Sequence, residues 1–189
     1  MSYSVYPAPS SGITVNDLIT KPKWTLIESY TTNSGSSKTF SGLSGYGLYR
    51  LAFVGMRWSA SANIEARING VTTARYFQIG EQGTDVSLDY AQSNASSFYL
   101  GYYHSDSQVP SYGYMDIYNA NSDGFKEGEL YLSTRNSSNT TEYMRTKMTF
   151  DMGGNPGPVT SIEIFNVTGP TFNFNTSIPG YGLHLYGGK

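Results

Sequence analysis

The stretch that decides the fold is GLYRLAFVGMRW, residues 47–58, followed by SANIEARIN, residues 61–69. In each run, apolar side chains recur at every second position, which places them on one side of an extended chain. They are Tyr49, Leu51 and Phe53 in the first run, and Ile64, Ala66 and Ile68 in the second. This period of two is typical of antiparallel strands with one buried face and one solvated face.

From Trp24 onward, the rest of the chain repeats this pattern in short runs separated by Gly, Asn, Ser and Pro. The runs are rich in β-branched and aromatic residues, which favour strands. They are WTLIESYT (24–31), TARYFQIG (73–80), SFYLGYY (97–103), YGYMDIYN (112–119), ELYLSTRN (129–136), YMRTKMTFD (143–151), TSIEIFNV (160–167), TFNF (171–174) and GLHLYG (182–187). Met115 with Ile117, and Leu130 with Leu132, alternate in the same way. Roughly ten short strands predict an all-β, two-sheet antiparallel β-sandwich of jelly-roll type.

Two segments carry turn signals, and the first 23 residues differ from the rest. Asn69-Gly70 is the dipeptide preferred in a two-residue type I′ hairpin, so we predict a hairpin there. Residues 153–158, GGNPGP, predict an irregular loop, because proline cannot donate to a ladder. Residues 1–23 are proline-rich and predict an extended arm before a sandwich domain at 24–189, with a disordered terminus as the alternative. The residues expected to anchor this arm to neighbouring subunits are Tyr3, Tyr6, Pro7 and Pro9.

The composition excludes several classes of function. The chain has 189 residues and no cysteine, which removes disulfides, thiolate metal sites and cysteine nucleophiles. Its 12 basic residues are scattered and the net charge is -2, so the basic stripe that nucleic-acid binding needs is missing. The apolar runs are too short to span a bilayer, and the opening residues lack the features of a secretory signal. We therefore expect no nucleic-acid or membrane partner.

Candidate residues for covalent chemistry are few. The chain has two histidines, His104 and His184, and no G-x-S-x-G elbow. His184 alternates with two leucines and is expected at a solvent or subunit surface. The acidic residues are mostly isolated, whereas a glycosidase needs two carboxylates in one cleft. We expect no catalytic residues and no cofactor, and a glycan-cleaving enzyme remains an alternative.

One loop resembles the start of a calcium-binding EF-hand. Asn119, Asn121 and Asp123 place side-chain oxygens at alternate positions before Gly124. The first position is not aspartate, and the twelfth is Leu130 instead of a bidentate glutamate. A polar hairpin loop is the favoured interpretation, because the same residue types favour turns. We expect no metal site, although calcium binding at this loop stays open.

The segment most expected to carry function is FYLGYYHSDSQVPSYGYMDIY, residues 98–118, which holds six tyrosines. It predicts a hairpin whose loop is 104–111. Tyrosine combines a large flat ring with a hydroxyl, which suits both sugars and protein surfaces. Contact with another subunit, contact with a glycan, and ordinary core packing are the alternatives. The candidate binding residues are Tyr102, Tyr103, His104, Asp106, Gln108, Tyr112 and Tyr114.

The opening of the chain resembles small virion proteins of tailed bacteriophages. The run PAPSSGITVNDLITKPKWTLIESYTTNSGSSKTFSGLSGYGLYRLAF, residues 7–53, is similar to their Pro-rich arm, W-x-L-I motif, Ser/Gly loop and Y-R-L motif. The residues ARING (66–70), Tyr76 and the closing GYGLHLYGGK (180–189) are also similar. The resemblance implies a jelly-roll protein of a phage particle, oligomeric and often trimeric, and it assigns no binding residues.

The function expected from these features is a non-enzymatic structural component of a tailed-phage virion. The leading hypothesis is a tail appendage or fibre protein that self-assembles, as a trimer, contacts other virion proteins through its arm and binds a host-surface glycan. A capsid decoration protein that clamps coat-protein junctions is the first alternative. A free carbohydrate-binding module is a further one. Each version places the protein on the external surface of the virion.

Overall fold

A computed structural model describes residues 23–73, 75–83, 89–103, 110–135, 141–150 and 157–189. These residues are all-β and form two antiparallel sheets, which confirms the predicted sandwich. The strands are β1 (Trp24–Tyr30), β2 (Ser37–Ser41), β3 (Leu48–Met56), β4 (Ala62–Ile68), β5 (Tyr76–Gly83), β6 (Asp89–Ala95), β7 (Phe98–Tyr103), β8 (Ser111–Tyr118), β9 (Lys126–Arg135), β10 (Thr141–Phe150), β11 (Ser161–Asn166) and β12 (Gly182–Gly188). Within the described residues, no helix is long and apolar enough to cross a membrane.

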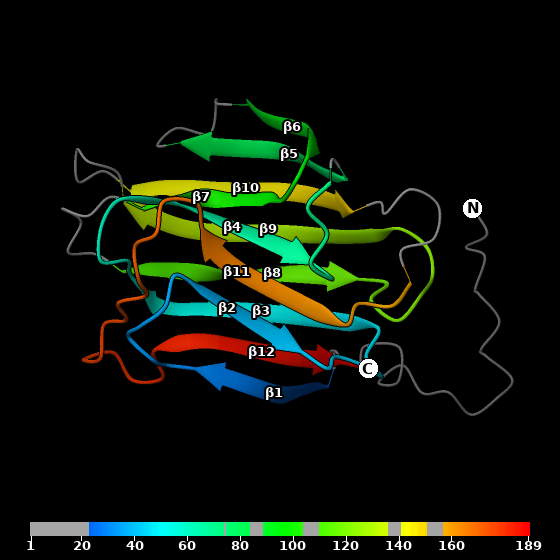
Figure 1. Cartoon of the computed structure of the whole chain (residues 1–189), viewed down its shortest axis with the longest axis horizontal. Coiled ribbons are helices and arrows are strands. Elements are labelled where there is room, and N and C mark those ends of the chain that lie inside the picture. Colours follow the sequence, from blue (N-terminus) through cyan, green and yellow to red (C-terminus); the bar gives the residue numbers. More distant parts are fainter. Residues whose placement is uncertain (1–22, 74, 84–88, 104–109, 136–140, 151–156) are drawn as a thin grey trace, which may run out of the picture.

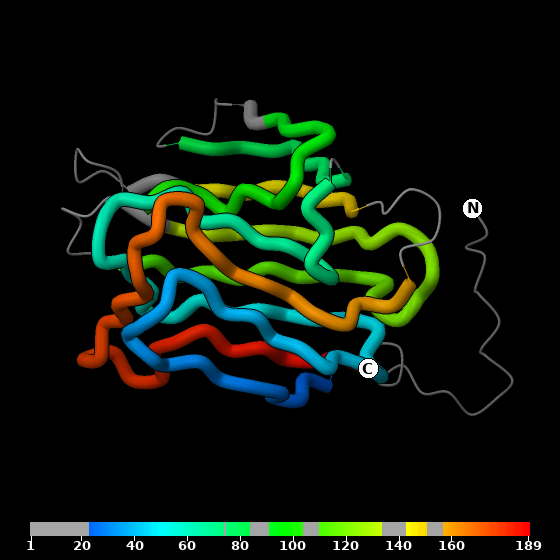
Figure 2. Tube along the Cα trace, viewed as in Figure 1, coloured from blue at the N-terminus to red at the C-terminus, as the bar shows by residue number. Residues whose placement is uncertain are grey.

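The two sheets differ in size. The larger has eight strands in the order β1-β12-β3-β8-β9-β10-β5-β6, and the smaller has four in the order β2-β11-β4-β7. Figure 1 shows the smaller sheet lying across the larger one, so that the larger sheet has one covered face and one outer face. The first and last strands, β1 and β12, run side by side at one end of the large sheet (Figure 2).

The core lies between the sheets and follows the alternation in the sequence. All of the apolar residues singled out for their period of two are buried. They are Tyr49, Leu51, Phe53, Ile64, Ala66, Ile68, Met115, Ile117, Leu130 and Leu132. Two more buried rings complete this layer: the Trp58 ring stacks on Phe172, and the Tyr76 ring lies tilted against Phe150. The side chains between these positions point away from the core and form the outer faces.

The Asn69-Gly70 turn forms as predicted, but it does not join a hairpin. Both residues have positive φ, 54° and 66°, and the Val71 N–H donates to the Ile68 carbonyl at 3.1 Å. However, β4 pairs with β11 and β7, whereas β5 pairs with β10 and β6. The hairpin prediction is therefore wrong: the turn carries the chain from one sheet to the other, because strand pairing depends on distant partners that turn chemistry does not specify.

Hydrogen bonds from other segments fix this turn in place. The Asn69 carboxamide oxygen accepts from the Thr160 and Ser161 N–H groups at 2.7 and 3.1 Å. The Tyr76 hydroxyl accepts from the Ile68 N–H at 3.0 Å and donates to the Val71 carbonyl at 2.9 Å. The start of β11 and the start of β5 therefore both clamp the crossover between the sheets.

Strand prediction missed two edge strands and overstated one run. Strands β2 and β6 have mostly polar sequences, and both lie at the edge of a sheet, where one side of the strand needs no partner. The run TFNF (171–174) forms only an isolated bridge between Phe172 and Trp58. The arm residues Tyr3, Tyr6, Pro7 and Pro9 lie outside the described residues, as does most of the proline-rich loop 153–158.

Candidate functional site

The tyrosine-rich segment 98–118 does not form the predicted hairpin. Strand β7 lies at the edge of the small sheet beside β4, whereas β8 lies inside the large sheet between β3 and β9. Strand β8 cannot pair with β7, because β3 and β9 flank it on both sides. The hairpin prediction is therefore wrong, and the candidate residues on the two strands are separated.

The individual candidates have different surroundings. Tyr103 is 2% exposed and belongs to the core, while Tyr102 is half-buried in the small sheet. Burial raises the pKa of the Tyr103 hydroxyl, so it stays protonated. The structure places Tyr112 and Tyr114 on the outer face of the large sheet. His104, Asp106 and Gln108 lie outside the described residues. The described residues therefore do not bring all seven candidates together in one site.

The outer face of the large sheet instead brings together tyrosines from three strands. Tyr114 of β8 lies directly opposite Tyr131 of β9, and their ring centroids are 6.2 Å apart. Tyr143 of β10 lies diagonal to Tyr131, with the centroids 6.5 Å apart. Tyr131 and Tyr143 are 40% and 44% exposed. We name Tyr114, Tyr131 and Tyr143 the tyrosine ladder.

A glycine beside the ladder allows its strands to approach closely. A Cβ atom added to Gly113 would lie 2.0 Å from the Tyr131 carbonyl oxygen and 2.8 Å from the Leu132 Cα. Any side chain at this position would push β8 away from β9. Gly113 is therefore needed for the local spacing that sets Tyr114 against Tyr131.

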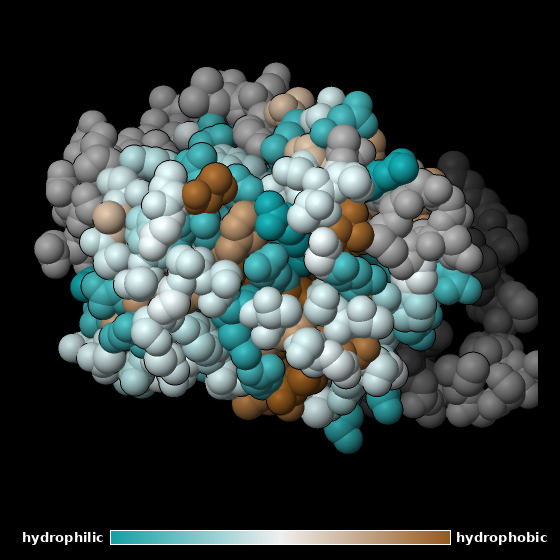
Figure 3. Space-filling view, viewed as in Figure 1, coloured by the Kyte–Doolittle hydropathy of each residue, from teal (hydrophilic) through white to brown (hydrophobic). Residues whose placement is uncertain are grey.

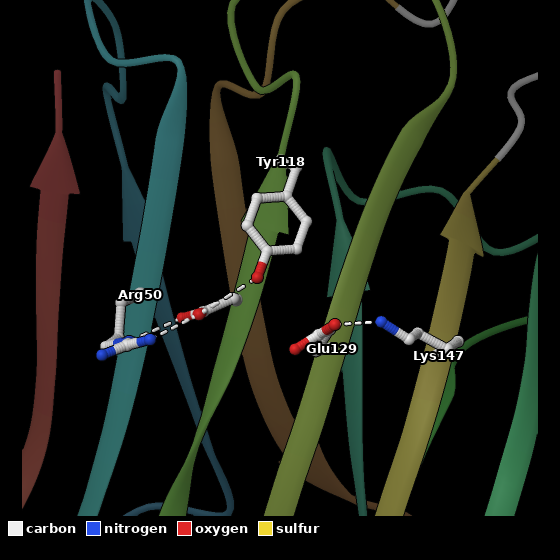
Figure 4. Close-up of polar contacts among 5 residues, drawn as sticks. Arg50, Tyr118, Glu129 and Lys147 are labelled. Carbon is white, nitrogen blue, oxygen red and sulfur yellow. Dashed lines mark hydrogen bonds and ion pairs between the residues drawn. The ribbon is translucent and has the colours of Figure 1, made fainter. Parts of the chain in front are cut away.

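Next to the ladder, four charged side chains form a row across four strands. The register places Arg50 opposite Asp116, Asp116 opposite Glu129, and Glu129 opposite Lys147. The Arg50 guanidinium donates to both Asp116 carboxylate oxygens, at 2.7 and 2.6 Å, and Lys147 forms an ion pair with Glu129 (Figure 4). Carboxylates directly opposite each other repel, so the cation on each side stabilises this pair.

Aromatic rings hold the Arg50 end of the charged row. The guanidinium carbon lies 4.7 Å from the Trp24 ring centroid and 4.4 Å from that of Tyr114. Cations attract the negative faces of aromatic rings at these distances. The hydrogen bond to Asp116 raises the pKa of Arg50, so the group stays charged. Arg50 thus links the charged row to the tyrosine ladder.

Tyr118 supplies a neutral hydroxyl beside the two carboxylates. Its hydroxyl points toward the middle of the charged row in Figure 4 and lies 3.5 Å from an Asp116 oxygen. Burial, followed by the charges of Asp116 and Glu129, raises its pKa to about 12. The hydroxyl therefore stays protonated at neutral pH and remains a hydrogen-bond donor on this face.

A hollow of about 250 Å³ lies between the ladder and the charged row. It combines flat rings, carboxylates and cations within one small depression. The side chains that line it come from β5, β8, β9 and β10 and include Ile79, Glu81, Tyr114, Glu129, Tyr131, Arg145 and Lys147. The floor lies over Gly80 and the backbone of the central strands. Such a mixture can pack against a flat ligand and hydrogen-bond to its edges.

The opposite face of the sandwich is different. Figure 3 shows this face to be mostly hydrophilic or neutral over the small sheet, with few hydrophobic patches. Its outward side chains come largely from Ser, Thr, Glu and Arg, and they pair with one another, as do Arg67 with Glu163 and Ser97 with Glu65. The aromatic face of the large sheet is therefore the stronger candidate for ligand binding.

His184 has a structural role in this arrangement. Its Nδ1 lies 2.9 Å from the Ser29 hydroxyl, and its Nε2 lies 2.8 Å from the Gly180 carbonyl. A carbonyl can only accept, so Nε2 donates to it and Nδ1 accepts from Ser29. Both ring nitrogens thus link β12 to neighbouring chain segments.

The EF-hand-like loop is occupied by a lysine side chain. The Lys126 ammonium is buried and donates to the carbonyls of Ser122 and Gly124, at 2.5 and 2.8 Å. Burial lowers the pKa of Lys126, while Asp123 acts in the opposite direction. The loop joins the paired strands β8 and β9, which confirms the predicted polar hairpin loop. The Lys126 ammonium therefore ties the two carbonyls of this loop together.

Sequence reasoning missed Arg50, Tyr131 and Tyr143 as site residues. The signal was present, because Tyr131 lies between two buried leucines and must face outward. What the sequence did not provide was the register that aligns β3, β8, β9 and β10.

Comparison with known proteins gives no relative from which a function could be transferred. No protein-family model, no curated protein and no solved structure matches the chain.

Proposed function

We propose that the chain is a non-enzymatic structural component of a tailed-phage particle whose tyrosine ladder binds a glycan of the host surface. The observation that carries the binding role is the ladder itself, with Tyr131 exposed between the hollow and Tyr143. The phage assignment rests on the resemblance of residues 7–53 and 180–189 to small virion proteins, and the β-sandwich agrees with it.

A sugar fits this face because it offers both kinds of contact that sugars use. The apolar side of a pyranose ring packs on an aromatic ring, and its hydroxyls need donors and acceptors around that ring. Tyr131 provides the ring, Glu129 provides acceptors, and Arg145 and Lys147 provide donors. These groups all lie on strands of one sheet, so little ordering is needed when a ligand binds.

A permanent subunit interface fits the same face less well. The centre of such an interface is depleted of charged residues. Here the charged row crosses the middle of the sheet beside the ladder. In the proposed particle the subunits therefore associate through other surfaces, as a trimer, and several copies of a weak glycan site add up to firm attachment.

A glycan-cleaving activity is also less well supported. A glycosidase needs one carboxylic acid held protonated and a second carboxylate free to attack or to activate water. Asp116 and Glu129 are adjacent, but each is bound to a cation on its other side. Both carboxylates are therefore already paired with a cation, and neither is free to attack a sugar or to activate water.

Glycan-array binding with purified protein tests the proposal. We expect wild type to bind at least one host-type polysaccharide, and Tyr131→Ala to lose about 5- to 30-fold in affinity, since one lost ring contact costs about 1–2 kcal/mol. Tyr102→Ala is the matched control, because Tyr102 lies on the small sheet and should not matter. Binding that depends on Tyr102 but not on Tyr131 would contradict the proposed face. If Tyr131→Ala lost self-association but kept glycan binding, the face would be a subunit interface instead.

A further inference from the structure

Two further hollows adjoin the first on the outer face of the large sheet. One, of about 240 Å³, lies over β8, β9 and β10 between Tyr118 and Lys147. The other, of about 290 Å³, lies over β10, β5 and β6 between Lys147 and Ala91. Both are lined by Lys147 and Thr149, and Lys147 also lines the hollow beside the tyrosine ladder. Lys147 is therefore the point at which all three depressions meet.

The register shows that the two further hollows lie in one line. One border is the row that runs from Asp116 through Glu129, Lys147 and Ile79 to Ala91. The other border is the parallel row that runs from Tyr118 through Glu127 and Thr149 to Phe77. The hollows therefore form a strip that crosses the strands from β8 to β6. Four spacings between neighbouring strands make this strip roughly 19 Å long.

The charges around the strip disfavour an anionic ligand. Among the side chains that the structure describes on the bordering rows and on the ladder row beside them, three are cations and four are carboxylates. The cations are Arg50, Arg145 and Lys147, and the carboxylates are Glu81, Asp116, Glu127 and Glu129. A polyanion would meet a face with a small excess of negative charge. A neutral chain of hydroxyl-bearing rings instead finds donors and acceptors in nearly equal supply.

The apolar end of the strip indicates where the chain continues. Ile79 is 66% exposed, and together with Phe77 and Ala91 it lines the β5–β6 end of the strip with apolar side chains. The β8 end has the Tyr118 hydroxyl and two glutamates instead. A polymer that alternates apolar ring faces with hydroxyl edges can contact both ends at once.

From this geometry we infer that the ligand is an extended, neutral polysaccharide that lies across the strands from β8 to β6 and occupies about four sugar units. Lys147, which also lines the hollow beside Tyr131, lies at its centre. The inference rests on the proposed glycan-binding function and adds the ligand class and its direction. A single terminal sugar would fill only one of the three hollows and leave most of this surface unoccupied.

The test measures affinity against chain length by isothermal titration calorimetry. The probes are neutral oligosaccharides of one to six units from glucan, mannan, galactan and chitin, with oligogalacturonides as the anionic series. We expect one neutral series to gain at least about tenfold in affinity between the dimer and the tetramer and then to level off. Ala91→Ile, which adds bulk to the β6 end of the strip, should remove most of that gain. Ser37→Ile adds the same bulk to an exposed edge strand of the small sheet and should change nothing.

The outcomes separate the inference from the function on which it rests. Equal affinity for dimer and hexamer would refute the extended chain while leaving glycan binding intact. Tighter binding of oligogalacturonides than of every neutral series would refute the neutral ligand. Failure of every series, together with a blank glycan array, would refute the proposed function itself. An unchanged length dependence in Ala91→Ile would place the chain elsewhere on the face and refute its direction across the strands.

Discussion

Replacing Lys126 by methionine will destabilise the protein by about 2–3 kcal/mol, because it removes the cation from the 119–125 turn. Lys126 is 1% exposed, and methionine keeps most of its length and its apolar stem. The ammonium makes two short hydrogen bonds to carbonyls of Ser122 and Gly124, and bonds to a charged group contribute about 1.5–3 kcal/mol each. Desolvation of the ammonium, which lowers the pKa of Lys126, offsets part of that gain. Water can reach the freed Gly124 carbonyl because Gly124 is exposed. The net loss of unfolding free energy is therefore smaller than the sum of the two hydrogen bonds.

Urea denaturation followed by tryptophan fluorescence measures this loss, with the m-value expected to stay unchanged. Lys147→Met is the matched control, because Lys147 is 73% exposed and a surface ion pair contributes at most about 1 kcal/mol. We also expect millimolar calcium chloride to leave the unfolding midpoint of wild type unchanged, since the ammonium already binds the loop carbonyls. A loss below about 0.5 kcal/mol in Lys126→Met, or a clear stabilisation of wild type by calcium, would refute the role given to Lys126.

Three further predictions concern the sheet and its crossover. Burial raises the pKa of Tyr76 from 10.0 to about 12, so the unfolded chain loses this proton first as pH rises. The free energy of unfolding should therefore fall by roughly 2–3 kcal/mol between pH 10 and pH 12. Denaturation measured across this range checks the fall, and a flat profile would contradict it. Tyr76→Phe should reduce that slope, with the remainder coming from the other tyrosines of raised pKa. It should also cost about 1–3 kcal/mol at neutral pH, because the Ile68 N–H and Val71 carbonyl lose their partner. Gly113→Ala should cost about 3 kcal/mol or more in a thermal melt. Gly124→Ala, whose Cβ would meet only the Ser122 hydroxyl oxygen at 3.9 Å, should change stability little, and equal effects would refute the close approach of β8 and β9.

The fold class followed from local sequence because burial in a sandwich obeys a period of two. Tyr49, Leu51 and Phe53 alternate with solvated side chains, and no distant information is needed to recognise that pattern. Pairing is different, since β4 and β5 are neighbours in the chain but belong to different sheets. The Asn69-Gly70 turn has the φ angles of a hairpin turn and still serves as a crossover. Local signals therefore identify strands and turns, and long-range contacts decide which strands pair.

The candidate site was only partly predictable for a related reason. Density of tyrosine in the sequence pointed to 98–118, but alternation sends Tyr103 into the core while Tyr112 and Tyr114 face outward on another sheet. Tyr131 is the single tyrosine of its run, so the density of tyrosine in the sequence does not mark it. Only the pairing of β8 with β9 places it against Tyr114. Rings that are far apart in sequence thus formed the cluster, whereas rings that are adjacent in sequence were separated.

A site built from rows across strands depends on register more strictly than the fold does. The charged row draws Arg50, Asp116, Glu129 and Lys147 from four strands, and each lies one position away from a core residue. A shift of one residue in any pair would bury a charge and expose a core side chain, so burial of the core enforces the register of the outer face. The same hydrophobic residues that hold the two sheets together therefore also align the ladder, the charged row and the strip. Substitutions in the core that loosen β8 against β9 should impair ligand binding before they unfold the sandwich.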